Sequence, residues 1–120
     1  MRILFNSNKI KKLCTDYSYA QRKLGNRMVK VLFTRINELR AKDNLSEISN
    51  LPPQRLHSID GIRKDSYSID LIHPFRLIIA IDNSSIFKKE DGTIIFEKVE
   101  YIIIKDVEDY HGKQRKWVLA

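Results

Sequence analysis

The chain carries three histidines, and one of them closes the run Asp109-Tyr110-His111. Histidine exchanges protons near neutral pH because its ordinary pKa is about 6.5. A neighbouring carboxylate can orient an imidazole or favour its protonated form, and a tyrosine can donate a hydrogen bond or stack on a base. Residues 109–111 therefore indicate either the wall of an active site or a solvated tail. His73 stands before a proline in an expected turn and is interpreted as an ordinary surface residue.

Several common kinds of site are not indicated by the residue spacings. There is no HExxH, no CxxC and no Asp-rich loop for a metal, and no Gly-rich phosphate loop or GxSxG for nucleotide or ordinary hydrolase chemistry. The lone Cys14 has no partner for an internal disulfide, which favours a reducing compartment. No apolar run approaches the ~20 residues of a membrane span. We expect a cytoplasmic protein with no metal, no cofactor and no membrane contact.

Metal-free cleavage of RNA remains compatible with the residue types. RNA supplies its own nucleophile, the 2′-hydroxyl, so the protein has to align it, accept its proton, protonate the leaving 5′ oxygen and neutralise the phosphate oxygens. Histidines, a carboxylate, a tyrosine and an arginine suffice. Segments expected to be strands, or to follow them, offer His57, Arg76, Asp109, Tyr110 and His111. The pattern leaves open which histidine is the acid and which is the base.

Basic residues are concentrated in the first third of the chain. Residues 7–42 contain ten Lys or Arg against two acids, an excess of eight, whereas the net charge of the whole chain is +7. Lys23, Arg27 and Lys30 share one face of an expected helix. Such a face is a candidate footprint for a polyanion, nucleic acid above all, or else a solubilising helix surface. Charge alone does not decide between them.

The elements that would position these residues follow from the hydrophobic period. At 120 residues we expect a single domain, 1–120. Helical spacing predicts one helix over 7–16 and a longer one from Ser18 to about residue 43, with a capping box at Ser18 and Gln21. After Pro52-Pro53 the period changes to two. Strands are predicted at residues 1–5, 55–59, 66–72, 75–82 and 99–107, the last of them central.

These elements predict an α+β fold, in which two N-terminal helices pack on one face of a twisted antiparallel β-sheet. Asp91-Gly92 is a hairpin turn signal between two apolar stretches, so residues 83–99 are predicted to form an extra β-hairpin insertion. Residues 112–120 are a C-terminal extension with the only tryptophan, Trp117.

Three stretches, "RLHSIDGIRKDSYSIDL", "PFRLIIAI" and "VEYIIIKDVEDYH", resemble the plasmid-maintenance killer proteins, or HigB group, of the RelE/ParE toxin superfamily. The ordered pieces of that family's pattern are here Leu56-His57, Gly61-Ile62-Arg63, Tyr67-Ser68-Ile69, Phe75-Arg76-Leu77 and Asp109-Tyr110-His111. The likeness covers most of residues 10–111, helices included, and implies a RelE/ParE-like fold.

The resemblance implies the toxin of a type II toxin–antitoxin system, a ribosome-dependent endoribonuclease (an mRNA interferase) that cuts translated messages. The implied partners are the ribosome, messenger RNA and a cognate HigA-like helix-turn-helix antitoxin. His57, Asp109, Tyr110 and His111 match residues implicated in catalysis, and Arg76 matches the arginine thought to hold the scissile phosphate. The residues expected to contact RNA or the ribosome are Lys23, Arg27, Lys30, Arg63, Lys64 and Lys113.

The sequence departs from the family pattern in three places. Asp60 stands where the family usually has a lysine, and would repel a phosphate by ~1 kcal/mol if solvated; Lys64 or Lys113 could substitute. The 83–99 insertion is longer than the expected turn, and residues 112–120 extend past the usual end. Two alternatives stay open: a ParE-like inhibitor of DNA gyrase that cleaves no RNA, and a relative with weakened catalysis that only binds an antitoxin.

Overall fold

The computed structural model describes residues 1–59, 65–82, 87–111 and 114–117, and for residues 110–111 and 114–117 it describes the backbone alone. Arg63, Lys64 and Lys113 of the expected site, and Asp60, therefore lie outside the described residues. In chain order the elements are β1 (Arg2–Phe5), α1 (Asn8–Thr15), α2 (Tyr17–Leu24), α3 (Asn26–Ala41), η1 (Leu45–Glu47), β2 (His57–Ser58), β3 (Ser66–Asp70), β4 (Phe75–Ala80), η3 (Phe96–Lys98), β5 (Tyr101–His111) and β6 (Gln114–Trp117).

The described residues form three α-helices where the sequence predicted two, and each begins and ends at identifiable residues. The side chain of Ser7, the first residue of the helix predicted over 7–16, caps α1 by accepting from the Ile10 N–H. Asp16 caps α2 by accepting from the Tyr19 N–H at 3.0 Å, so the predicted start at Ser18 is wrong. The predicted long second helix is interrupted at Gly25, whose φ of 88° and ψ of 167° suit glycine alone.

The sheet is mixed, which corrects the predicted antiparallel arrangement. Its strand order is β1-β5-β4-β3-β2, and β6 also pairs with β5. β1 runs parallel to β5, with Arg2 opposite Tyr101, whereas the other pairs are antiparallel. Parallel pairing is possible because the whole helical region separates β1 from the later strands, so no short turn fixes their direction. The prediction that β5 is central is confirmed.

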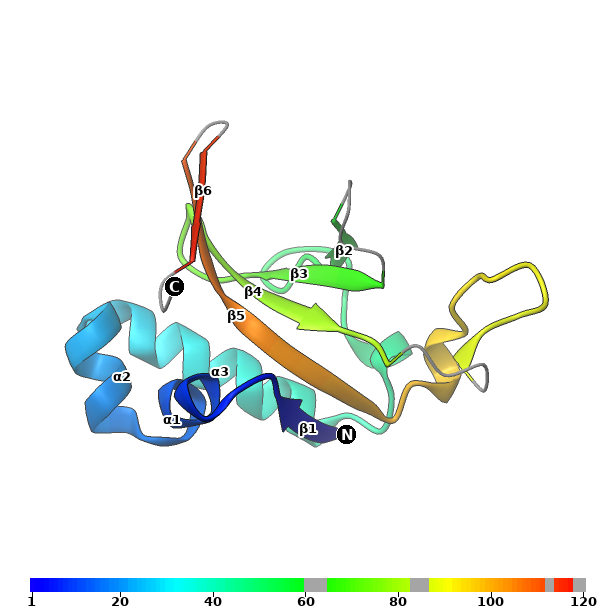
Figure 1. Ribbon diagram of the computed structural model, residues 1–120, viewed down its shortest axis with the longest axis horizontal. Helices are drawn as coiled ribbons and strands as arrows, with labels where there is room; N and C mark the ends of the chain where they lie inside the picture. Colours follow the sequence, from blue (N-terminus) through cyan, green and yellow to red (C-terminus); the bar gives the residue numbers. More distant parts are fainter. Residues whose placement is uncertain (60–64, 83–86, 112–113, 118–120) are drawn as a thin grey trace.

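The helices cover one face of the sheet (Figure 1) and enclose the main hydrophobic core with it. That core contains the predicted stripe of α3 and the alternate residues of β3, β4 and β5, among them Leu32, Ile36, Ile69, Leu77 and Val107. Alternation along a strand directs the residues between them to the opposite face. The helix layer therefore fixes which strand residues are left for a site. No helix in the described part of the chain is long and apolar enough to cross a membrane.

The described parts of the 83–99 insertion and of the 112–120 extension differ from the simple hairpin and the tail that the sequence suggested. In the described part of residues 83–99, a single bridge joins Lys88 to Ile94 around the Asp91-Gly92 turn. The predicted two-stranded hairpin is thus reduced to one bridge, followed by η3. This segment projects past the end of the sheet (Figure 1), although Phe87 is buried. In the extension, β6 pairs with residues 108–111 of β5, a strand that the sequence did not predict.

Candidate functional site

The described residues include three buried polar or charged ones, Ser66, Ser68 and Glu108. Strand register places all three on the face of the sheet that the helices do not cover. Ser68 lies opposite Ile78, and Glu108 lies opposite Arg76. We call this face the polar face. Buried polar groups are usually satisfied or functional, so their concentration on one face marks it as the candidate site.

Two rows of residues cross the polar face from strand to strand. In the first row, register joins His57 of β2, Ser68 of β3, Ile78 of β4 and Asp106 of β5. The second row joins Asp70, Arg76 and Glu108, so that charges of alternating sign stand side by side on three strands. Ile78 is buried but does not belong to the main core, which agrees with its position on this face.

Arg76 is held by an ion pair with Glu108. Its Nε atom donates to Oε2 of Glu108 at 3.0 Å, and its Nη2 atom lies 2.9 Å from the same oxygen. The Glu108 side chain is 0% exposed and that of Arg76 is 16% exposed. Arg76 thus lies outside the main core, as the strand alternation predicts, in an orientation that a buried carboxylate fixes. Sequence reasoning missed Glu108, because the central strand was predicted to end at residue 107, whereas β5 continues through Glu108 to His111.

A backbone carbonyl near His57 determines which ring nitrogen carries the hydrogen in the neutral imidazole. Its Nδ1 atom lies 2.7 Å from the carbonyl oxygen of Arg55. A carbonyl oxygen only accepts, so Nδ1 must carry the hydrogen, and the Nε2 atom of the neutral ring is the acceptor. Arg55 has a φ of 49°, in the left-handed region, and in this conformation its carbonyl oxygen lies next to the imidazole. The half-buried His57 therefore has the tautomer that a general base acting through Nε2 requires.

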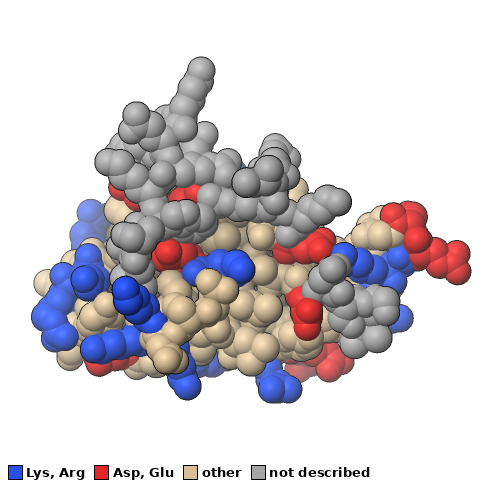
Figure 2. All heavy atoms as spheres, viewed as in Figure 1, with Lys and Arg blue, Asp and Glu red and all other residues tan. Residues whose placement is uncertain are grey.

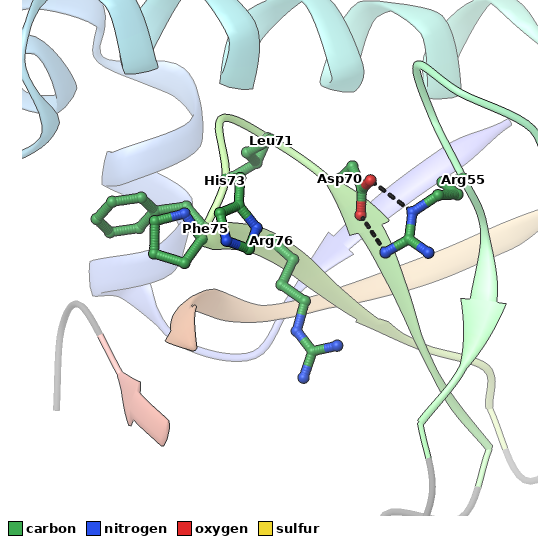
Figure 3. Close-up of a pocket in the computed structure, with 7 residues that line it drawn as sticks. Arg55, Asp70, Leu71, His73, Phe75 and Arg76 are labelled. Carbon is green, nitrogen blue, oxygen red and sulfur yellow. Dashed lines mark hydrogen bonds and ion pairs between the residues drawn. The ribbon is translucent and has the colours of Figure 1, made fainter. Parts of the chain in front are cut away.

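A cavity of about 210 Å³ opens at the end of β3 and β4 (Figure 3). It is lined by residues 70–71 and 73–76 together with Arg55. Arg55 donates to both carboxylate oxygens of Asp70, at 2.7 and 3.3 Å, on one side of the view, while Arg76 and His73 lie on the other. His73, interpreted from the sequence as an ordinary turn residue, thus lines the cavity beside Arg76. Cationic groups here suit an anionic ligand such as a phosphate.

Asp106 and Ser68 add two further polar groups to the first row. Burial raises the pKa of the Asp106 carboxyl above its ordinary value; the Val107 N–H, which donates to it at 2.7 Å, opposes that shift, and the nearby Glu108 carboxylate adds to it. The Ser68 side chain is fully buried, and within the described part of the chain its Oγ has no hydrogen-bond partner. Sequence patterns indicated neither residue as part of a site.

The remaining predicted catalytic residues lie on β5. Asp109 pairs with Phe75, one position along from the Arg76–Glu108 pair, so alternation directs it away from the polar face. The backbones of Tyr110 and His111 pair with β6, and their side chains are outside the described residues. β2 is separated from β5 by two strands, or about 14 Å of strand spacing. The structure thus brings His57 and Arg76 to one face and does not bring Asp109 to it.

The three predicted basic contact residues that the structure describes lie in the helix layer, on the other side of the sheet. Lys23, Arg27 and Lys30 are all exposed on α2 and α3. Lys and Arg side chains gather over the α1–α2 end of the molecule, at the left of Figure 2. Lys12 and Lys23 both approach the ring of Tyr19, with Nζ 4.5 and 5.8 Å from its centroid. The polar face and this basic helix surface are therefore two separate surfaces.

Comparison of the chain with protein-family models, with curated proteins and with solved structures finds no match in any of the three. Within the part of the chain that the structure describes, no group of three His, Cys, Asp or Glu side chains is placed to hold a metal ion. The chemistry of the site therefore has to be argued from its own residues.

Proposed function

We propose that the chain is the toxin of a type II toxin–antitoxin system with a RelE/ParE-like fold, and that its polar face cleaves messenger RNA on the ribosome in the cytoplasm. One observation carries the proposal: His57, with Nε2 as acceptor, shares a sheet face with Arg76, which the buried Glu108 holds in place. A base and an arginine of fixed orientation are the two groups that attack by a 2′-hydroxyl needs most.

These positions support the following reaction. His57 lies two strands from Arg76 and one row away, about 10 Å across the sheet, so one nucleotide can contact both side chains. Nε2 of His57 takes the proton of the 2′-hydroxyl while the 2′ oxygen bonds to phosphorus. Arg76 neutralises the charge on the phosphate oxygens. The bond to the 5′ oxygen then breaks and that oxygen gains a proton, which leaves a 2′,3′-cyclic phosphate and a 5′-hydroxyl end.

For the acid that protonates the 5′ oxygen, the family resemblance points to the run that ends the site, and of that run we propose Tyr110 or His111, because Asp109 lies off the polar face. The exposed Lys23, Arg27 and Lys30 would contact ribosomal RNA through the other side of the molecule. Contacts of this kind release counterions, so ribosome binding should weaken steeply with salt. A HigA-like helix-turn-helix antitoxin would neutralise the toxin.

The test is induced expression of the chain followed by mapping of message 5′ ends. We expect growth arrest with cuts inside ribosome-occupied codons, and loss of the cuts in His57→Gln. His73→Gln is the matched control, because that histidine lines the cavity but has no assigned part in the reaction. Intact messages in arrested cells would refute the nuclease proposal.

A second candidate, a ParE-like toxin that binds DNA gyrase without cutting RNA, is favoured by a specific observation. The arginine expected to hold phosphate is already paired with Glu108, and Asp109 lies off the polar face. On this alternative the Arg76–Glu108 pair is purely structural. A supercoiling assay with purified gyrase separates the two candidates, because only the gyrase inhibitor would block supercoiling while messages stay intact.

A further inference from the structure

β1 is an edge strand whose outer backbone groups face away from the sheet. The N–H groups of Arg2 and Asn6 donate to the carbonyl oxygens of Glu100 and Ile104, each at 3.0 Å. In a parallel pair every second residue bonds to the neighbouring strand, so Ile3 and Phe5 direct their backbone groups outward. Among the described residues, no strand pairs with this outer edge. An edge of this kind is a template for pairing with another chain.

An open groove runs along the same edge. It has a volume of about 740 Å³ and is lined by residues 3–8 and Lys11 of α1. Leu4, which is 40% exposed, is one of three large hydrophobic residues exposed in the described part of the chain. A groove beside unpaired backbone groups, with an exposed apolar side chain in it, is the arrangement that accepts an extended peptide by β-strand addition.

The charges around the groove select the kind of peptide. Arg2 and Lys11 are exposed, and the exposed Lys105 donates from Nζ to Oδ1 of Asn6 at 3.3 Å. Glu100, just before β5, is exposed and contributes a negative charge that partly offsets these positive charges. The balance is positive, and the same charges would repel each other across a symmetric pair of β1 strands. A second copy of the chain is therefore a poorer occupant than an acidic segment.

We propose that the outer edge of β1 binds an extended, acidic segment of a partner protein, which adds one strand to the sheet. The outward N–H and C=O groups of Ile3 and Phe5 bond to the partner's backbone, the apolar side chains of the partner contact Leu4, and its carboxylates lie near Lys11 and Lys105. This goes beyond the proposed nuclease activity and does not depend on it, because the groove lies on the β1 edge, away from His57 and Arg76.

The test uses the full chain and a labelled peptide of alternating glutamate and valine, with binding followed by fluorescence anisotropy. Ile3→Pro removes one outward N–H and leaves the pairing with β5, since that N–H does not point to β5. We expect up to about a tenfold loss of affinity, the equivalent of one hydrogen bond, with an unchanged circular dichroism spectrum. Leu4→Glu should weaken binding more than Leu4→Lys, because both variants lose the apolar contact but only the glutamate repels the acidic peptide.

Each outcome decides the proposal. Unchanged affinity in a folded Ile3→Pro variant would overturn it, as would equal binding of a lysine–valine peptide or equal effects of the two Leu4 variants. If Ile3→Pro does not fold, the Leu4 pair, which alters only an exposed side chain, gives the answer. A wild-type dimer in sedimentation that Leu4→Glu dissociates would assign the edge to a second copy and also overturn the proposal.

Discussion

The ion pair between Arg76 and Glu108 can be tested through the free energy of unfolding. The cavity at the end of β3 and β4 is lined by two arginines, Arg55 and Arg76, and each is paired with a carboxylate of different burial. Glu108 is 0% exposed and Arg76 16%, whereas Arg55 and Asp70 are 50% and 31% exposed. Arg76→Ala and Arg55→Ala are therefore matched changes of one residue type at two depths.

Burial sets the expected magnitudes. Arg76→Ala removes an ion-pair partner from a fully buried carboxylate, and breaking a buried pair in this way costs about 3–5 kcal/mol. Glu108→Gln should cost less, about 1–3 kcal/mol, because the amide can still accept a hydrogen bond and Arg76 reaches solvent. Arg55→Ala should cost about 0–1 kcal/mol, the usual range for an exposed pair. Domains of this size are stable by about 5–15 kcal/mol, so the first change is severe.

Urea unfolding followed by far-ultraviolet circular dichroism would measure all three variants and the double variant Arg76→Ala/Glu108→Gln. We expect the double variant to lose less than the sum of the two single losses, by about 0.5–3 kcal/mol, because the buried negative charge that Arg76 neutralises is no longer present. An Arg76→Ala protein within 0.5 kcal/mol of the wild type, or strictly additive losses, would show that the pair does not hold Arg76. Nuclease assays of Arg76→Ala need this stability measurement as a control.

Three further predictions concern other parts of the fold. Burial raises the pKa of Asp106 in the folded state, so the charged carboxylate destabilises the fold at neutral pH. Asp106→Asn should therefore raise the melting temperature at pH 7. This gain should disappear as the pH falls through the folded-state pKa, because the wild-type carboxylate then takes up a proton. Burial raises the pKa of Cys14 to about 12, so a thiol reagent should label it in urea and not in the native protein, and rapid native labelling would contradict the burial. Gly25→Ala should lower the free energy of unfolding by about 1–3 kcal/mol through backbone strain alone, because a Cβ there meets no atom within 4 Å; an unaffected urea midpoint would refute this.

Local patterns predicted most elements because each depends on the periodicity of a short stretch. The apolar stripe of α3, the turn at Asp91-Gly92 and the central position of β5 follow from side-chain spacing and composition. The break at Gly25 could have been predicted, since helices commonly end at glycine. The apolar spacing continues through Gly25, however, and therefore favoured one long helix. The parallel direction of β1 could not be predicted, because pairing between strands distant in sequence leaves no local sequence signal.

The sequence by itself determined which residues could take part in chemistry, through their types and their order: His57, Arg76 and the run that ends at His111. The tertiary structure alone decided which of them share a face. Cross-strand register places Arg76 opposite Glu108 and Asp109 opposite Phe75, and it places His57 in a row with Ser68 and Asp106. A shift of one residue in that register would reverse every side chain on a strand, and only the burial of the whole sheet against the helices fixes it.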